Sequence, residues 1–344
     1  MTPTTTRQWI LAEQPMDMPD EKTFKLVEAP LPELKEDQVL AKVLYLSNDP
    51  AQRGWIQKGI NPERLYVPPV ELNAPMSARG IAEVIESKSS KFPKGSLVVS
   101  GVNWVEYCVL DAATCTPVQK VGDLSETHFL GALGLTGLTA YYGLQIVRAG
   151  AEDTVVVSGA AGATGSMVVQ IAKKMFGCKK VIGIAGTDDK CRWVESLGAD
   201  LCINYKSPTF RKDLREATKG YVEVYFDNVG GKILDLMLTR MATYGRVAAC
   251  GAISGYNNHT DVYGLKCWSE IITNRIEIRG FIVLDAGAKI PSMIGELAQA
   301  YKEGKLQLGA ESETVVPTAF DSIPKTWMKL FAGENTGKLV TKIE

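Results

Sequence analysis

Histidine is scarce in this sequence, and the usual combinations of zinc ligands are missing from it. The 344 residues include 2 histidines, His128 and His259, and neither lies in an HExxH motif. The 7 cysteines are scattered and form no CxxC pair, which disfavours both a four-cysteine zinc site and a disulfide framework. We therefore expect no functional metal, with buried thiols and two imidazoles at the surface.

Charge imbalance and long apolar runs are also absent. The formal net charge is −1, which leaves no electrostatic footprint for nucleic acid or an anionic membrane. No apolar run reaches the roughly 18 residues of a membrane span. The start of the chain lacks the charged-then-apolar layout of a signal peptide, and the final TKIE is not a retention or peroxisomal signal. We expect a cytoplasmic protein without nucleic-acid or membrane partners.

The pattern of strands and helices changes along the chain and predicts two domains. Residues 1–133 contain short β-type runs such as RGIAEVIES and GSLVVSGV, broken by Gly, Pro and Ser, which favour a small barrel or sandwich. Residues 134–308 alternate β-type and helical runs, which predicts an α/β fold with a doubly wound parallel sheet. Residues 309–344 become β-type again and would return to the first domain.

The first of the alternating units carries a glycine-rich turn between a strand and a helix. The stretch VVVSGAAGATGSMVVQIAK places Gly159, Gly162 and Gly165 in a GxxGxxG pattern. Gly162 would let the backbone approach a pyrophosphate, Gly165 would let the helix pack on the strand, and the helix N-terminus would attract the anion. Ser166 and Gln170 begin a non-apolar stripe on this helix, opposite the apolar face that is expected to pack inward. The turn predicts a dinucleotide site.

Two residues after the second strand leave the choice between NAD and NADP open. Asp188 in IAGTDDK lies near the offset of the acidic residue that binds the ribose hydroxyls of NAD. Lys190 follows in the next turn, where a cation can pair with the 2′-phosphate of NADP. On the residues alone, Lys190 is equally well explained as a solvated lysine in the first turn of a helix.

Several motifs together resemble those of one enzyme family. The order and spacing of zinc-independent medium-chain dehydrogenases/reductases recur in LGALGLTGLTAYYGL, GAAGATGSMVVQIAK, INYK, YFDNVGG, GRVAACGAISGYN, RGFIVL and GENTGKLVTKI. The sequence most resembles the branch of NADPH-dependent 2-alkenal and other double-bond reductases, which includes the prostaglandin and leukotriene reductases. LSNDPAQRGW matches the SxDPxxR segment of that family. The resemblance implies a GroES-like catalytic domain at 1–133, a Rossmann NADPH-binding domain at 134–308 and a C-terminal return at 309–344.

The resemblance also implies which residues contact NADPH. They would hold the pyrophosphate at the glycine turn, the 2′-phosphate beyond the second and third strands, and the nicotinamide beyond the last strands. The set comprises Gly162, Ala163, Thr164 and Gly165; Lys190 and Tyr205; Asn228; Cys250, Gly251, Ala252, Ile253, Ser254 and Tyr256; Phe281, Ile282 and Val283; and Asn335. On the residues alone, Asn228 could be a turn former, Cys250 a buried strand residue and Tyr205 a strand aromatic.

By the same resemblance, the reaction is reduction of the carbon–carbon double bond of enals and enones. Hydride from NADPH reaches the β-carbon, and the enolate is then protonated at the α-carbon, without zinc. A neutral tyrosine hydroxyl suits stabilisation of the enolate oxygen. Tyr256 is the first candidate, followed by Tyr263 and Tyr66. Tyr66 could be only a loop aromatic, and Arg53 is expected to position the N-terminal segment.

The chain departs from related enzymes at two places, and other functions stay open. In zinc alcohol dehydrogenases a histidine–glutamate ligand segment lies near PMSARGIAEV, where this chain has Ser77, Ala78, Arg79 and Gly80; this excludes the zinc mechanism on ligand grounds. Ala51 replaces a frequent aromatic and would reshape the substrate pocket. The alternatives are an NADPH:quinone oxidoreductase and a non-catalytic NADPH-binding sensor. Since the family often pairs through its Rossmann sheets, we expect a homodimer.

Overall fold

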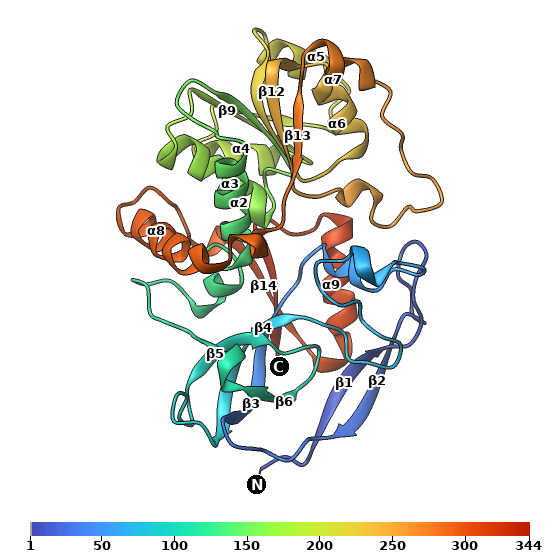
Figure 1. Cartoon of the computed structure of the whole chain (residues 1–344), viewed down its shortest axis with the longest axis vertical. Helices are drawn as coiled ribbons and strands as arrows, with labels where there is room; N and C mark the ends of the chain where they lie inside the picture. The colour runs from blue at the N-terminus through green and yellow to red at the C-terminus, as the bar shows by residue number, and fades with distance from the viewer. Residues whose placement is uncertain (1) are drawn as a thin grey trace. The chain divides into compact units, whose positions relative to one another are not determined.

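The computed structural model describes residues 2–344 and divides into two compact units (Figure 1). Unit 1 comprises the chain up to Leu130 together with Thr314–Glu344, and unit 2 comprises Gly131–Glu313. The boundaries expected after residues 133 and 308 differ from these by a few residues. Within residues 2–344, none of the helices combines the length and apolarity needed to cross a membrane.

Unit 1 is built on a 7-stranded sheet with the order β14-β15-β3-β4-β5-β7, in which β3 also pairs with β6. Its strands are β3 (Gln38–Ser47), β4 (Arg79–Ser87), β5 (Leu97–Gly101), β6 (Tyr107–Asp111), β7 (Thr116–Pro117), β14 (Glu313–Thr318) and β15 (Lys338–Ile343), beside a separate pair β1 (Thr5–Leu11) and β2 (Phe24–Pro30). Its helical segments are α1 (Gln52–Trp55), η1 (Pro62–Arg64), η2 (Ala112–Thr114), η3 (Glu126–Leu130), η8 (Phe320–Ser322) and α9 (Ile323–Ala332). Because β15 pairs with β3, the C-terminal segment completes the first sheet.

Three aromatic rings form the centre of the core of unit 1. The Phe24 and Trp104 ring centroids lie 4.9 Å apart, and those of Trp104 and Trp327 lie 5.8 Å apart. Trp104 and Trp327 are completely buried. Trp327 lies on α9, so these contacts fix the C-terminal helix against segments from the N-terminal half of the chain. Burial of such large aromatic rings stabilises this packing.

Unit 2 contains a 6-stranded parallel sheet with the order β10-β9-β8-β11-β12-β13. Its strands are β8 (Thr154–Ser158), β9 (Lys180–Ala185), β10 (Leu201–Asn204), β11 (Val222–Asp227), β12 (Met241–Ala249) and β13 (Glu277–Gly280). Its helices are α2 (Leu135–Ile146), α3 (Ala163–Gln170), η4 (Ile171–Met175), α4 (Asp188–Ser196), α5 (Phe210–Ala217), α6 (Gly231–Leu238), η5 (Ile253–Gly255), α7 (Trp268–Thr273), η6 (Val283–Lys289), α8 (Ile290–Lys302) and η7 (Ala310–Ser312). The predicted doubly wound sheet beside a β-rich domain is confirmed.

Helices cover both faces of this sheet. In Figure 1, α2, α3, α4 and α8 lie on one side of it and α5, α6 and α7 on the other. Val155, Val156 and Val157 on the central strand β8 are therefore all fully buried, as expected for a parallel strand with two covered faces. The strand order reverses between β8 and β11, which is where a doubly wound sheet opens a crevice for ligands.

The helix after the glycine turn departs from the predicted amphipathic pattern. Ser166 and Gln170, expected on its non-apolar stripe, are 4% and 1% exposed. The Gln170 side chain instead accepts from the main-chain N–H of Gln307 at 2.7 Å. The segment of Gln307 therefore lies against Gln170 on this helix, and a single helix pattern does not reveal such a neighbour. Beyond Gln170 the helix continues as a π-helical turn, η4.

Candidate functional site

The predicted nucleotide residues of unit 2 lie along one edge of its parallel sheet. All strands of a parallel sheet end on the same side, so segments that follow them meet there. The glycine turn follows β8, Lys190 and Tyr205 follow β9 and β10, Asn228 follows β11, Cys250–Tyr256 follows β12, and Phe281–Val283 follows β13. Residues spread over about 120 positions of sequence are thereby brought to one edge.

The glycine turn is sterically closed at Gly165. A Cβ on Gly165 would lie 2.2 Å from the carbonyl oxygen of Gly159 and 2.8 Å from the Cα of Ala160. Gly159 itself has a φ of 59°, in the left-handed region that favours glycine. Gly162 occupies the N-cap of α3, and no side chain there caps the N–H groups of the first turn. The N–H groups at this helix start therefore face the edge as a cradle for an anion such as a pyrophosphate.

Asn228 is fixed by a buried polar network around Asp227. Asp227 is 2% exposed, and its Oδ1 accepts hydrogen bonds from Ser158 Oγ at 3.0 Å and Tyr225 Oη at 2.8 Å, as well as from the N–H of Gly230 at 2.9 Å. Burial and the nearby Asp227 carboxylate raise the pKa of Tyr225, so its hydroxyl stays a donor. Asn228 Nδ2 donates to the Ser158 carbonyl at 2.7 Å. The network joins the ends of β8 and β11, on either side of the point where the strand order reverses.

The loop after β12 is held by the same network. The N–H groups of Cys250 and Gly251 donate to the Asp227 carbonyl at 2.9 and 3.0 Å. Burial, with a smaller effect of Asp227, raises the pKa of Cys250 to about 12, so its thiol is protonated at neutral pH. Tyr256 Oη accepts from the N–H of Ala252 at 3.1 Å. The first tyrosine candidate therefore lies on the loop that the strand edge positions.

The other two tyrosine candidates lie in different surroundings. Tyr263 Oη donates to Asp235 on α6 at 3.0 Å, and that carboxylate also accepts from the N–H groups of Lys266 and Cys267. Tyr263 thus anchors the segment before α7 to α6. Tyr66 lies in unit 1, with 46% of its surface exposed. Of the three tyrosines, the structure brings Tyr256 together with the other candidate residues of unit 2.

Beyond β9 and β10, Lys190 and Tyr205 are joined by a residue that the sequence analysis did not single out, Lys206. Its Nζ lies 5.8 Å from the centroid of the Tyr205 ring. A Cβ on Gly186 would lie 3.2 Å from Tyr205 and 3.7 Å from the Lys206 side chain, so the three positions are close. Burial and the charge of Lys206 lower the pKa of Lys190. Two mutually repelling ammonium groups beside an aromatic ring suit a phosphate dianion.

Asp188, the alternative that would favour NAD, is engaged elsewhere. Its Oδ1 accepts from Asn204 Nδ2 at 2.8 Å.

Lys206 directly follows Tyr205 in the INYK motif, so its position after a strand was visible in the sequence. Its proximity to Lys190 was not, because it depends on the pairing of β10 with β9.

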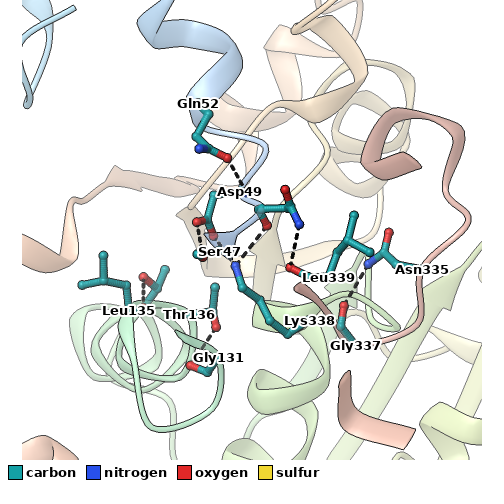
Figure 2. A network of polar contacts seen from close by, with 12 residues as sticks. Ser47, Asp49, Gln52, Gly131, Leu135, Thr136, Asn335, Gly337, Lys338 and Leu339 are labelled. Carbon is teal, nitrogen blue, oxygen red and sulfur yellow. Dashed lines mark hydrogen bonds and ion pairs between the residues drawn. The ribbon is translucent and has the colours of Figure 1, made fainter. Parts of the chain in front are cut away.

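A second polar network lies in unit 1, around the SxDPxxR segment (Figure 2). The Lys338 side chain is 3% exposed, and its Nζ lies 2.5 Å from Asp49 Oδ1 and 3.0 Å from the carbonyl oxygen of Asn48. Asp49 Oδ2 accepts from Ser47 Oγ at 2.5 Å, and the Asp49 N–H donates to Gln52 Oε1 at 2.8 Å. The buried ion pair connects the first residue of β15 to the turn after β3. Asn335, just before β15, donates from Nδ2 to the carbonyl of Gly337 at 2.8 Å.

The last residue of the SxDPxxR segment has a positioning role. Arg53 is completely buried, and its Nη2 donates to the carbonyl oxygens of Pro15, Met16 and Asp17 at 3.2, 3.1 and 2.6 Å. Burial lowers its pKa to about 10, so the guanidinium stays charged at neutral pH. These bonds hold the segment before β2 against α1.

The segment at residues 77–80, where zinc alcohol dehydrogenases carry ligands, contributes a main-chain hydrogen bond. Ser77 accepts from Gln52 Nε2 at 2.8 Å through its main-chain oxygen. Among residues 2–344, no three His, Cys, Asp or Glu side chains gather as metal ligands would.

One expectation was wrong: His128 is not at the surface but 4% exposed, with Nδ1 3.0 Å from Ser125 Oγ. His128 lies on η3 within unit 1, where Thr127 and Leu130 are buried as well.

Comparisons with known proteins agree with this geometry. Residues 7–118 match the family described as the N-terminal domain of oxidoreductase, and residues 163–299 match the family described as zinc-binding dehydrogenase. The chain is 35% identical to mouse prostaglandin reductase 1, with 98% of each chain covered. It is 36% identical to the 2-alkenal reductase (NADP(+)-dependent) of Nicotiana tabacum, over 98% of this chain and 97% of that one. The crystal structure of CurA in complex with NADPH from Vibrio vulnificus superposes with a TM-score of 0.89 at 31% identity, over 98% and 99% of the two chains.

Proposed function

Since this chain belongs to the medium-chain dehydrogenase/reductase family, in the branch of the prostaglandin and 2-alkenal reductases, we propose that it reduces the carbon–carbon double bond of enals and enones with NADPH and without zinc. The observation that carries this proposal is the edge of unit 2. There a glycine cradle, a pair of lysines and a tyrosine-bearing loop lie where one dinucleotide could contact them all.

The residues at this edge fit NADPH. The uncapped start of α3, with Gly162, Ala163, Thr164 and Gly165, would hold the pyrophosphate. Lys190, Tyr205 and Lys206 would hold the 2′-phosphate. We assign the remaining contacts to Asn228, to the loop Cys250, Gly251, Ala252, Ile253, Ser254 and Tyr256, to Phe281, Ile282 and Val283, and to Asn335 of unit 1.

When bound, NADPH supplies the hydride that adds to the β-carbon of the substrate. Negative charge then grows on the carbonyl oxygen, and the Tyr256 hydroxyl would donate a hydrogen bond to it. One such donor is worth about 3 kcal/mol of transition-state stabilisation. The α-carbon then takes a proton from the tyrosine or from water. Tyr66 stays a candidate for substrate contact, whereas the hydrogen bond to Asp235 makes Tyr263 the weakest of the three candidates.

Steady-state oxidation of reduced cofactor tests the proposal. A medium-chain 2-alkenal should be reduced with NADPH much faster than with NADH, because only NADPH carries a 2′-phosphate for Lys190 and Lys206 to bind. Turnover of quinones without turnover of the alkenal would replace the proposal with a quinone oxidoreductase. NADPH binding with no turnover of either substrate would favour a sensor.

We further propose that two copies associate through the edge of the unit 2 sheet. The strand β13 ends the strand order, so its outer edge is open to another strand. Three apolar side chains in and just before it are exposed: Trp268 at 59%, Ile272 at 68% and Ile278 at 39%. Light scattering should give the mass of a dimer, and Ile272→Asp should give that of a monomer.

We also propose a cytoplasmic location. Each of the seven cysteines is a free thiol, as is usual in a reducing compartment. Fractionation of cells that express the protein, followed by detection of the chain, would test this location.

A further inference from the structure

Asp227, at the end of β11, is a buried carboxylate without a cation beside it. Its side chain is 2% exposed. Its Oδ1 accepts four hydrogen bonds, at 3.0, 2.8, 3.1 and 2.9 Å, from Ser158 Oγ, Tyr225 Oη and the N–H groups of Val229 and Gly230. Within residues 2–344 these donors are all neutral, and no lysine, arginine or histidine forms an ion pair with the carboxylate. Four donors on one oxygen suit an ionised carboxylate, which accepts and cannot donate. A buried charge without an opposite charge is costly.

The turn that carries Asp227 is hydrogen-bonded to the loop after β12. The Asp227 carbonyl oxygen accepts from the N–H groups of Cys250 and Gly251, at 2.9 and 3.0 Å. The Val229 carbonyl oxygen accepts from the N–H of Ser254 at 3.1 Å and from its Oγ at 2.7 Å. All of these residues belong to unit 2. The carboxylate and the loop that we expect at the nicotinamide end of NADPH are therefore parts of one hydrogen-bonded unit.

The negative charge of Asp227 acts on this loop. Burial raises the pKa of the Cys250 thiol, and the charge of Asp227 raises it further. An environment that disfavours a negative thiolate favours a positive charge at the same place. The proposed reaction creates one positive charge at this edge of the sheet, because loss of hydride turns the neutral nicotinamide ring into a cation.

We propose that the Asp227 carboxylate favours the oxidised over the reduced nicotinamide cofactor and thereby promotes hydride transfer to the substrate. This inference rests on the proposed function. In that reaction a hydride, one proton with two electrons, leaves the ring and forms the new C–H bond at the β-carbon. The ring gains a positive charge, and the substrate becomes an enolate that then takes a proton at the α-carbon. Asp227 stabilises the positive charge electrostatically, since charge near the reactive ring is one means by which a protein tunes a cofactor.

The ratio of two dissociation constants tests this assignment without any substrate. Isothermal titration calorimetry gives the Kd of NADP⁺ and that of NADPH, and the first divided by the second should rise about tenfold in Asp227→Asn. This factor is the one that Coulomb's law gives for unit charges about 10 Å apart at an effective dielectric constant of about 20. A structural role alone would weaken the binding of both cofactors equally. An unchanged ratio in Asp227→Asn would therefore overturn the assignment.

Two control variants separate the charge from the hydrogen bonds. Tyr225→Phe removes one hydrogen bond from the carboxylate and keeps its charge. Asp235→Asn removes the charge of another buried carboxylate of unit 2, which lies on α6 and accepts from the N–H groups of Lys266 and Cys267. Both variants should keep the ratio of the unaltered protein. A rise in either one as large as that in Asp227→Asn would contradict a specific effect of the Asp227 charge.

A measurement on the unaltered protein covers the case in which Asp227→Asn does not fold. NADP⁺ and NADPH share their phosphates and differ in the nicotinamide ring, so a negative charge near the ring should make NADP⁺ bind at least as tightly as NADPH. Binding of NADPH that is tighter by about tenfold or more would overturn the assignment.

Failure of the proposed function has a different signature. The unaltered protein would then bind both cofactors without reducing an enal, and the ratio in Asp227→Asn would still decide the role of the carboxylate. Reduction of an enal together with an unchanged ratio would keep the proposed function and remove this inference. Absence of binding by either cofactor would overturn both.

Discussion

Substitution of Gly165 by alanine gives the sharpest steric prediction for the glycine turn. The added Cβ would lie 2.2 Å from the Gly159 carbonyl oxygen, where ordinary contact begins at 3.4 Å. The helix α3 and the turn after β8 must therefore separate by about 1 Å, the difference between these two distances. Since both contacts are with backbone, no side-chain rotation relieves them. Overpacking of this kind costs about 1–3 kcal/mol.

Thermal denaturation and titration with NADPH measure the two consequences. Gly165→Ala should lower both the stability and the affinity for NADPH, the latter by about 10- to 100-fold if the misplaced helix start loses the same energy in binding. Gly162→Ala is the matched comparison, because its Cβ would lie 3.3 Å from the Gly159 oxygen. It should keep most of the stability and still weaken NADPH binding, since the cofactor's phosphate must approach there. Wild-type affinity for NADPH in Gly165→Ala would refute the steric argument.

Three further substitutions test other parts of the account. Lys206→Met should raise the KM for NADPH by about 10- to 100-fold and leave that for NADH unchanged in steady-state assays; equal effects on the two cofactors would exclude a 2′-phosphate contact. Tyr256→Phe should lower kcat for an enal by about 100-fold with little change in NADPH affinity, whereas an unchanged kcat would remove the tyrosine from the mechanism. Lys338→Met should destabilise the protein by about 3 kcal/mol in chemical denaturation, because Asp49 would lose its buried partner; an unchanged midpoint would show that the ion pair contributes nothing net.

The parts of the fold that follow from local patterns could be predicted from the sequence. The alternation of apolar and helical runs after residue 134 predicted the parallel sheet, and the glycine spacing placed the tight turn directly after a β-strand. These features depend on residues close together in the chain.

Features that depend on long-range packing could not be predicted in the same way. The buried Gln170 is hydrogen-bonded to Gln307, 137 positions later. The proximity of Lys206 to Lys190 requires the pairing of β10 with β9. The tie between Tyr263 and Asp235 joins residues 28 positions apart. The resemblance to a family supplied the set of cofactor residues, and their roles stay predictions until variants are measured.

Transfer of deuterium from NADPH labelled at C4 of the nicotinamide to 2-nonenal tests the central claim most directly. Nuclear magnetic resonance and mass spectrometry of the product locate the label. Double-bond reduction predicts nonanal with deuterium on its β-carbon. An allylic alcohol with deuterium on the former carbonyl carbon would contradict the account, because the hydride would then have been added to the carbonyl group.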